Sequence, residues 1–318
     1  MAILGIDEVG RGPLAGPLVV GACVFKDDPK RLIAEDGPLA KLTDSKKLTI
    51  RQREQLAEII PQYADYALGW VSADRLDQIG ISAALKEATR MAVQQIKTPF
   101  HEIIIDGISN FLQGTKLEKH ATTLKKADLL IPEVSAAAIM AKVTRDDYMT
   151  KLADLFPEYG FEKHVGYGTK KHMEAIEKHG PCPEHRLSFR PLSETCKSRP
   201  IKKNTTKVGA QAETAVAEYL ARNGHQVIAR NWKTPFCEID LISAKDDHIY
   251  FTEVKYRKES SRGTGFQAVD NKKLKRMHFA TEMFLSTNKK SFSEVSPLLA
   301  VASVSGEKFE KIDVIVLD

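Results

Sequence analysis

The chain has 318 residues, of which 42% are hydrophobic and 28% charged, an ordinary composition for a water-soluble protein with room for two cores. Its net charge of +5 is compatible with a polyanionic partner but does not by itself identify one. No stretch approaches about 18 consecutive apolar residues, and the N-terminus lacks the basic and apolar regions of a signal peptide, so we expect a cytoplasmic protein without a membrane span.

The first part of the chain alternates predicted strands and helices. Apolar runs predict strands over 2–6, 18–25, 63–71 and 102–106. We expect helices over 50–60, ending at Pro61, and over 82–97. A short strand beginning at Asp128 then precedes a long helix, and a further short helix covers 169–178. This alternation indicates an α/β domain.

The long helix carries an apolar stripe, because its larger apolar residues recur at helical spacing. The members of the stripe are Val134, Ala138, Ala141, Tyr148, Leu152 and Leu155. Lys142 and Arg145 are expected to stand off this stripe.

A basic, polar segment over 196–208 interrupts the pattern and is typical of a linker. We therefore expect a domain over 1–197, a linker over 198–206 and a smaller α/β domain over 207–318. The predicted elements of the second domain are an amphipathic helix over 209–222, strands over 238–244 and 248–256, a helix over 269–286 and a strand over 311–317.

The four cysteines, at positions 23, 182, 196 and 237, do not have the spacing of a zinc site. No two of them form a C-x-x-C pair. We expect free thiols, which fits a reducing compartment.

Acidic residues recur where predicted elements of the first domain begin or end. Asp7 and Glu8 follow the first strand, Asp106 ends another, and Asp128 begins "DLLIP". Neighbouring carboxylates raise one another's pKa, and Mg²⁺ or Mn²⁺ relieves that repulsion. A pair of such ions activates a water and stabilises the leaving oxygen in phosphodiester cleavage. The alternative is a set of solvated acids at the ends of strands.

Gly10-Arg11-Gly12 follows the acid pair directly. Paired glycines permit a tight turn and a close approach of the backbone to a ligand. Their N–H groups are suited to hold a phosphate or to sense a sugar hydroxyl. A plain turn is the alternative.

A second group of polar residues lies on the two strands predicted near the middle of the second domain. Glu238 and Asp240 share one face of the first strand, and Glu253 and Lys255 share one face of the second. If a short turn joins the strands as a hairpin, Asp240, Glu253 and Lys255 converge. Such a set can hold one Mg²⁺ and orient a water. The alternative is a cross-strand salt bridge of little energetic weight.

Six stretches in order, "GIDEVGRGPLAGPLVVGACV", "LTDSKKL", "IDG", "KADLLIPEVSAAAIMAKVTRD", "HVGYGTKKH" and "HRLSF", resemble bacterial ribonuclease HII over residues of about 3–192. The resemblance implies a ribonuclease H-like mixed-sheet fold and a metal-dependent endonuclease. Its expected substrates are RNA/DNA hybrids and duplex DNA with embedded ribonucleotides. Cleavage is expected 5′ of the ribonucleotide, leaving 3′-hydroxyl and 5′-phosphate ends.

The same resemblance implies roles for individual residues. The metal-binding carboxylates would be Asp7, Glu8, Asp106 and Asp128. Gly10, Arg11 and Gly12 would read the ribose 2′-hydroxyl, the group that distinguishes RNA from DNA at one nucleotide, and Tyr167 would stack on the neighbouring sugar or base. Candidates for phosphate contacts, with solvated surface cations as the alternative, are Lys46, Lys142 and Arg145. No catalytic role is expected for His164, His185 or Arg186.

Residues 209–318 resemble the YraN family of small bacterial proteins, in stretches that include "EIDLI", "FTEVKYRK" and "IDVIVL". This resemblance implies a restriction-endonuclease-like fold and a nuclease-like site, which Glu213 on the first helix would complete. The alternative is a non-catalytic module that binds DNA or docks another protein. Protein partners cannot be inferred from the sequence.

Overall fold

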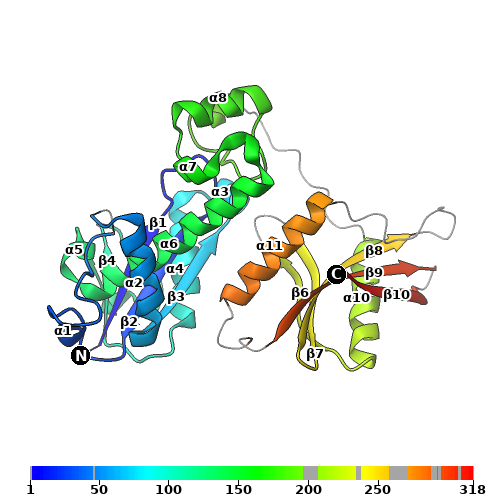
Figure 1. The fold of residues 1–318 in the computed structure, drawn as a ribbon, viewed down its shortest axis with the longest axis horizontal. Helices are drawn as coiled ribbons and strands as arrows, with labels where there is room; N and C mark the ends of the chain where they lie inside the picture. Colours follow the sequence, from blue (N-terminus) through cyan, green and yellow to red (C-terminus); the bar gives the residue numbers. More distant parts are fainter. Residues whose placement is uncertain are drawn as a thin grey trace. The chain divides into compact units, whose positions relative to one another are not determined.

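The computed structural model describes residues 2–45, 47–195, 207–233, 238–257, 271–287, 292, 295–306 and 309–317. The chain separates into two compact units, Met1–Ser198 and Arg199–Asp318 (Figure 1). The expected linker over 198–206 lies outside the described residues. Among the residues that the model describes, no helix combines the length and the apolar character needed to cross a bilayer.

The first unit is built around one five-stranded sheet. Its strands are β1 (Ile3–Val9), β2 (Leu18–Phe25), β3 (Ala64–Val71), β4 (Glu102–Asp106) and β5 (Ala121–Leu124). They lie in the order β3-β2-β1-β4-β5. The pairs β3–β2 and β2–β1 are antiparallel, whereas β1–β4 and β4–β5 are parallel, so the sheet is mixed as expected.

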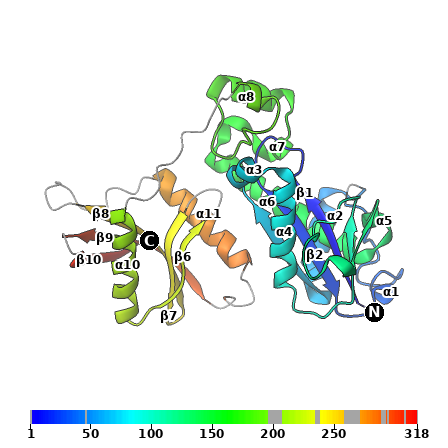
Figure 2. The same ribbon diagram turned by 180° about the vertical axis from the view of Figure 1, so that it is seen from behind.

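Helices cover both faces of this sheet. Those before the long helix are α1 (Pro29–Leu32), α2 (Ile50–Tyr63), α3 (Ala73–Ile79), α4 (Ile81–Gln95), the 3₁₀ turn η1 (Glu118–His120) and α5 (Ala127–Leu130). From the long helix onward they are α6 (Pro132–Leu155), the 3₁₀ turn η2 (Pro157–Tyr159), α7 (Phe161–His164), α8 (Lys170–His179) and α9 (Leu192–Thr195). Apolar residues of α2 and α6 pack on one face and those of α4 on the other. Figures 1 and 2 show the ribbons of these helices from opposite sides.

Two glycines bring α6 unusually close to the sheet. A Cβ on Gly5 of β1 would collide with the backbone of Glu133, and one on Gly21 of β2 would collide with the carbonyl group of Ala137. Because neither strand carries a side chain at these points, the first half of α6 lies directly on the central strands. Its residues from Glu133 to Ala141 are accordingly all buried.

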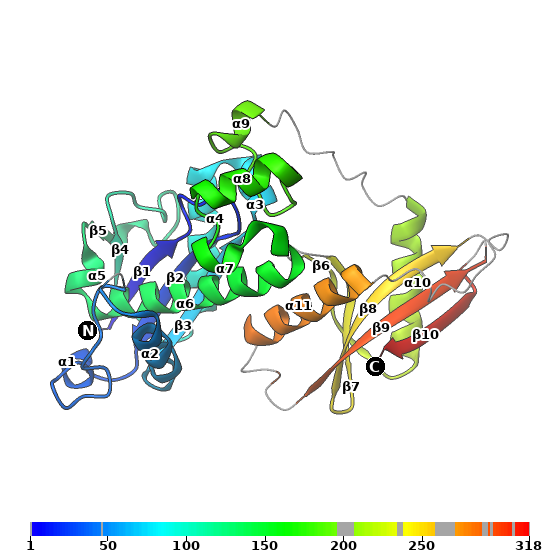
Figure 3. The same cartoon turned by 45° about the horizontal axis from the view of Figure 1, so that its top comes forward.

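The second unit is a smaller sheet between two helices. Its elements are α10 (Lys207–Arg222), β6 (Gln226–Lys233), β7 (Glu238–Lys245), β8 (His248–Arg257), α11 (Asn271–Thr287), β9 (Ser296–Ser305) and β10 (Lys311–Leu317). The strand order is β10-β9-β8-β7-β6, and only β8 and β9 run parallel. The helices α10 and α11 pack on opposite faces of the sheet (Figure 3).

Some sequence-based element predictions were wrong for identifiable reasons. Pro61 lies inside α2, whose last turn tolerates the one missing N–H donor. The segment after Asp128 is the short helix α5 and not a strand, because a short apolar run has no distinguishing periodicity. The elements that the sequence analysis did not predict include α3, β5, β6 and β9.

Candidate functional site

Asp7 and Asp106 lie at the same end of the two central strands. The parallel register pairs Ile6 of β1 with Ile105 of β4, so the two acids come next along their strands. Because paired residues of neighbouring strands share a face, both carboxylates leave the sheet on one side. Ile104, two residues before Asp106, packs against apolar residues of α5 and α6, so this is the side that those helices cover.

The helix α5 brings a third acid, Asp128, to the same side. The Oδ1 atom of Asp106 accepts a hydrogen bond of 2.7 Å from the amide of Ala127, which ties the end of β4 to the first turn of α5. Asp128 is only 7% exposed. Its carbonyl oxygen accepts a hydrogen bond of 2.7 Å from the hydroxyl of Ser135, which fixes α5 against α6.

Burial and mutual repulsion perturb these acids. Burial raises the pKa of Asp7 well above its usual range. The negative charges of Glu8, Asp106 and Asp128 raise it further. The pKa of Glu8 is raised as well, mainly by burial, while a hydrogen bond from Arg11 opposes the rise. Acids that destabilise one another's charged form in this way favour the binding of a cation.

Glu8 leaves β1 on the face opposite Asp7, because adjacent residues of a strand alternate. Its Oε1 atom pairs with a guanidinium nitrogen of Arg11 at 3.0 Å. Its Oε2 atom is buried and has no hydrogen-bond partner in the described part of the chain. In that same part, no three acidic, histidine or cysteine side chains form a preassembled metal cage. The four acids thus form an open arrangement.

The turn at Gly10-Arg11-Gly12 follows the acids and stands beside Tyr167. Gly10 has a φ of +86°, and a Cβ there would come within 2.7 Å of the carbonyl oxygen of Pro17, so the turn requires glycine. A Cβ on Gly12 would meet only the ring of Tyr167, at 3.7 Å. That ring is therefore next to the turn, and the Tyr167 residue is 47% exposed.

Two of the three predicted phosphate-binding cations remain candidates. Lys142 is partly exposed on α6 and pairs with Asp146 at 2.8 Å. Lys46 lies outside the described residues. The third, Arg145, is considered below because the structure gives it a different environment.

The acids predicted for the second unit meet where β7 and β8 pair. Leu241 lies opposite Thr252 in the antiparallel register, so Asp240 and Glu253 are next along the two strands. The Oδ2 atom of Asp240 accepts a hydrogen bond of 2.6 Å from the amide of Val254. The side chain of Glu238 is outside the described residues, so its predicted role is not tested.

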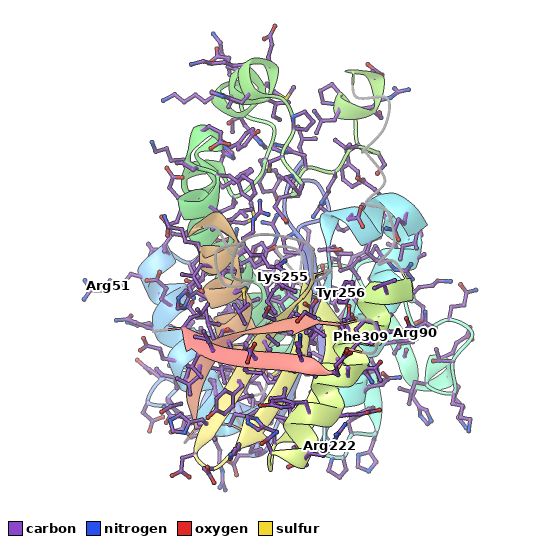
Figure 4. All side chains as sticks on the ribbon, turned by 90° about the vertical axis from the view of Figure 1, so that its right-hand side faces the viewer. Arg51, Arg90, Arg222, Lys255, Tyr256 and Phe309 are labelled. Carbon is purple, nitrogen blue, oxygen red and sulfur yellow. The ribbon has the colours of Figure 1, made fainter. Side chains whose placement is uncertain are left out.

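Glu253 is 5% exposed and pairs with two lysines. Its Oε1 atom lies 2.8 Å from the ammonium of Lys255, labelled in Figure 4 at the end of β8, and its Oε2 atom lies 2.9 Å from that of Lys273 on α11. The ion pairs of Glu253 are therefore formed with a lysine on the same strand and with a lysine on a helix, and not across the β7–β8 hairpin. The sequence analysis did not find Lys273, because its helix is far from the E-x-K pattern in the chain.

Burial raises the pKa of Asp240 to about 7, and the charges of Glu253 and Glu213 contribute. The nearby charge of Lys273 opposes the rise. Glu213 itself is 7% exposed on α10. The charges of two further predicted acids, Glu213 and Glu253, thus act on Asp240.

A comparison with protein-family models identifies the first unit. The model described as ribonuclease HII matches residues 4–192. The chain belongs to the ribonuclease HII family. A second model, described as the uncharacterised protein family UPF0102, matches residues 212–317.

Individual relatives agree with this assignment. The chain is 45% identical to ribonuclease HII of Sulfurovum sp. (strain NBC37-1) over 190 residues, which cover 59% of this chain and 91% of the relative. It is 44% identical to ribonuclease HII of Shewanella loihica over 193 residues, covering 60% and 88%. The crystal structure of ribonuclease H2 from Pyrococcus horikoshii OT3 matches with a TM-score of 0.51 and 27% identity, covering 61% of this chain and 96% of that one. The chain is accordingly a ribonuclease H endonuclease.

In this ribonuclease HII chain, Arg145 is not the exposed phosphate contact that the sequence analysis predicted. It is fully buried. Its guanidinium donates to the carbonyl oxygens of Pro17, Ala15 and Val165 at 2.9, 3.1 and 3.0 Å. The spacing of Ala141, Arg145 and Tyr148 places this arginine on the buried stripe of α6, not off it. Its donors hold the loop after Gly12 against the segment before Tyr167.

A second buried arginine, Arg186, was also missed as a structural element of the ribonuclease HII site. It is fully buried and donates to the carbonyl oxygens of Gly16 and Arg11, at 2.9 and 3.3 Å. Its own backbone amide donates to Leu14 at 2.7 Å. The sequence analysis expected no catalytic role for Arg186 and inferred no structural one, because the carbonyl group of Gly16 that it binds belongs to a residue 170 positions away in the chain.

Proposed function

We propose that the first unit is a divalent-metal-dependent endonuclease that cuts on the 5′ side of a ribonucleotide, in RNA/DNA hybrids and in duplex DNA, leaving 3′-hydroxyl and 5′-phosphate ends. The observation that supports this best is the grouping of three acids, Asp7, Asp106 and Asp128, at one end of β1 and β4. The turn at Gly10-Arg11-Gly12 continues directly from the same strand, with Tyr167 beside it.

The residues present fit a hard divalent cation. All four candidate ligands are carboxylates, the oxygen donors that Mg²⁺ and Mn²⁺ prefer. Burial and the neighbouring negative charges raise the pKa of Asp7, which means that its carboxylate form is unfavourable there. A bound cation would compensate that negative charge. The Oε2 atom of Glu8 is buried without a hydrogen-bond partner among the described residues and is suited to a cation or its water.

The open arrangement of the acids is compatible with such an ion. Mg²⁺ usually retains several waters and takes only one or two protein carboxylates, so a closed cage of protein ligands is not required. The ligands would be Asp7, Asp106 and Asp128 on one side of the sheet. Glu8 leaves β1 on the other side, but it lies near enough to Asp106 for that charge to raise its pKa, so it would complete the set. When bound, a divalent cation supplies an activated water and neutralises charge on the scissile phosphate.

The chain's own residues account for substrate discrimination. The backbone of the Gly10–Gly12 turn lies next to the acids without side chains at its two ends, so a sugar and its phosphate can approach closely. Hydrogen bonds from this turn to a 2′-hydroxyl would be lost with a deoxyribose, which leaves their partners unpaired and costs binding energy. Tyr167 offers a half-exposed ring to the neighbouring sugar.

The test is cleavage of a labelled DNA duplex that contains a single ribonucleotide. We expect cleavage with Mg²⁺ or Mn²⁺, its loss on chelation, and its return when the cation is restored. A DNA polymerase should extend the upstream product, because that product carries a 3′-hydroxyl. Cleavage that persists in excess chelator would contradict the metal dependence, and a product that cannot be extended would contradict the end chemistry.

For the second unit we infer a second nuclease-like site, built from Asp240, Glu253 and Lys255 with Glu213 and Lys273 nearby. The observation in its favour is a pair of buried acids at adjacent register positions, one of them holding two lysine ammonium groups. Such a set is suited to bind one Mg²⁺, while a lysine stabilises charge that develops on a phosphate. The alternative remains a module that only binds DNA or docks another protein.

This second site can be tested in the full chain with the first site silenced by Asp7→Asn. That variant, with and without Asp240→Asn, is incubated with single-stranded, duplex and branched DNA and a divalent cation. If the second unit is a nuclease, Asp240→Asn should abolish cleavage of the DNA while the protein stays folded. If no DNA is cut but DNA binding is unchanged by Asp240→Asn, the second unit is a tether; if neither cleavage nor binding is found, docking of a protein is favoured.

A further inference from the structure

Three imidazole rings pack together around the segment that carries Tyr167. The rings of His164 and His172 stack with centroids 4.4 Å apart, and those of His172 and His185 are 5.2 Å apart. His172 and His185 are both fully buried. None of the three belongs to the acids or the turn described above, so the proposed cleavage chemistry does not use them.

The partners of His172 determine which of its nitrogens carries the proton. Nδ1 lies 2.8 Å from the carbonyl oxygen of Tyr167, which can only accept, so Nδ1 donates. Burial and the nearby His164 keep the ring neutral, because they lower its pKa to about 4. A neutral ring has one N–H, so Nε2 of His172 must be an acceptor.

His185 supplies the hydrogen bond that this acceptor requires. Its Nε2 lies 3.0 Å from Nε2 of His172 and therefore donates. Its Nδ1 is then an acceptor and receives the amide of Cys182 at 2.9 Å, while the carbonyl oxygen of Cys182 is farther away at 3.3 Å. The protons form one directed chain from the Cys182 amide through His185 and His172 to Tyr167.

This chain ends on the backbone of Tyr167, whose ring is half exposed. The carbonyl oxygen of Tyr167 also accepts a hydrogen bond of 2.8 Å from the amide of Thr169, and the amide of Tyr167 donates to the carbonyl oxygen of His164 at 2.9 Å. A ring with so much free surface is not held in place by packing alone. The ring lies beside Gly12, and the hydrogen bonds to its peptide groups contribute to holding it there.

The same chain is anchored to the loop that follows the Gly10–Gly12 turn. The backbone of His185 pairs with Ala15 in an isolated β-bridge. The amides of Leu14 and Ala15 donate to the carbonyl oxygen of Gly166, at 2.8 and 3.2 Å. His185, which orients His172, is thus attached through its backbone to the loop that follows the Gly10–Gly12 turn.

We propose that His172 is a positioning residue for the substrate: with His185 as its orienting partner, it holds Tyr167 at a fixed place beside the Gly10–Gly12 turn. The proposal rests on the proposed function, because it assumes that Tyr167 contacts the substrate. It adds a residue whose action passes through the peptide of Tyr167 and not through the metal site. The expected consequence of its loss is weaker substrate binding, with the bond-breaking step little changed.

The first test compares two variants of the full chain at pH 7.5. His172→Leu removes the donor to Tyr167, whereas His172→Asn keeps an N–H close to the position of Nδ1. With a duplex that contains one ribonucleotide, His172→Leu should raise KM about tenfold, the equivalent of one hydrogen bond, and leave kcat within about twofold. The KM of His172→Asn should be close to that of the wild type. Equal effects of the two variants, or a fall in kcat alone, would overturn the proposal.

A double-mutant cycle separates positioning from a loss of stability. In a Tyr167→Ala background, His172→Leu should have no further effect on kcat/KM, because the ring it positions is absent. Its effect on thermal unfolding should be the same in both backgrounds. If His172→Leu lowers kcat/KM equally in both, it acts by another route and the proposal fails. If Tyr167→Ala alone leaves cleavage unchanged, the substrate contact assumed in the proposed function fails, and the inference fails with it.

Discussion

The carboxylate of Asp106 accepts a hydrogen bond of 2.7 Å from the amide of Ala127, the residue that precedes Asp128. This bond joins the end of β4 to a helix that begins 21 residues later in the chain. It explains how acids from distant parts of the sequence meet at one end of the sheet. Within the described part of the chain, this bond engages only one oxygen of Asp106, so the other is available to a ligand or to water.

Removing one of the grouped acids should stabilise the protein when no divalent cation is present. In Asp7→Asn, a buried carboxyl that is repelled by three neighbours becomes neutral, and we expect the first unit to gain about 1–2 kcal/mol in free energy of unfolding. Urea unfolding in chelator measures this. The control is Asp27→Asn, an exposed acid whose loss should change stability by less than about 0.5 kcal/mol. A clear destabilisation by Asp7→Asn would show that repulsion is not the dominant effect.

The two glycines of the turn should respond differently to alanine. Gly10→Ala forces a Cβ against the side chain of Arg145 and the carbonyl group of Pro17 at a positive φ, and should cost about 1–3 kcal/mol of stability. Gly12→Ala places its Cβ at an ordinary contact distance from Tyr167 and should leave stability nearly unchanged.

Measuring cleavage by these two glycine variants separates an effect on stability from an effect on substrate recognition. If the substrate backbone approaches the turn closely, Gly12→Ala should still lower kcat/KM on a ribonucleotide-containing duplex, by about tenfold or more. The measurement is steady-state cleavage beside thermal unfolding of the same preparations. A Gly12→Ala protein with both full stability and full activity would exclude a close approach at this position.

The sequence predicted that the four acids lie beside strongly apolar segments, although Asp7 and Glu8 belong to β1 and do not follow it as expected. Asp7 and Asp106 lie in strands that continuous apolar runs predict, and β2, β4 and β10 have the predicted bounds. Asp128 was placed on the wrong kind of element, since a run of three apolar residues does not distinguish a strand from a helical turn. Its spatial position depends on the tertiary bond between Asp106 and Ala127, which no local pattern encodes.

Buried polar residues were the main failure of the sequence analysis. A charged side chain is usually interpreted as exposed, so Arg145 was expected at the surface, and Arg186 was given no catalytic role. They are buried because the loop of residues 10–17 presents carbonyl groups that no strand or helix satisfies, and guanidinium groups supply several donors each. The sequence analysis also missed Lys273, because only the tertiary packing of α11 brings it to Glu253.

Arg145 should therefore act on stability and not on phosphate binding. Arg145→Lys keeps the charge but cannot reproduce the three hydrogen bonds to Pro17, Ala15 and Val165. We expect a loss of about 2–4 kcal/mol in urea unfolding. The matched control on the same helix is Lys142→Ala, which breaks a partly exposed ion pair and should cost less than about 1 kcal/mol. If both variants lose a similarly small amount of stability, the three hydrogen bonds of Arg145 do not contribute as predicted.

The histidine chain predicts a specific dependence of stability on pH. His172 is neutral in the folded protein down to a pKa of about 4, whereas in the unfolded chain it takes up a proton below its ordinary value of about 6.5. Its contribution is therefore complete above pH 6.5 and is lost as the pH falls from 6.5 toward 4. Between pH 7.5 and 5 it should remove about 2 kcal/mol of stability.

Comparison with a variant that cannot be protonated isolates this contribution. The stability of His172→Asn should fall less steeply over the same range, although the variant keeps the imidazole rings of His164 and His185, which face His172. Urea unfolding at a series of pH values measures the two slopes. Parallel slopes would mean that His172 carries a proton in the folded protein or does not differ between the folded and unfolded states.

The most direct test of the account is the rate at which the full chain cuts a DNA duplex with one embedded ribonucleotide, measured for the wild type and for Asp7→Asn. The account predicts a single cut on the 5′ side of the ribonucleotide, no cut in the matching all-DNA duplex, and a loss of at least about 10³-fold in rate for Asp7→Asn. Cleavage by Asp7→Asn at the wild-type rate, or equal cleavage of the all-DNA duplex by the wild type, would contradict it.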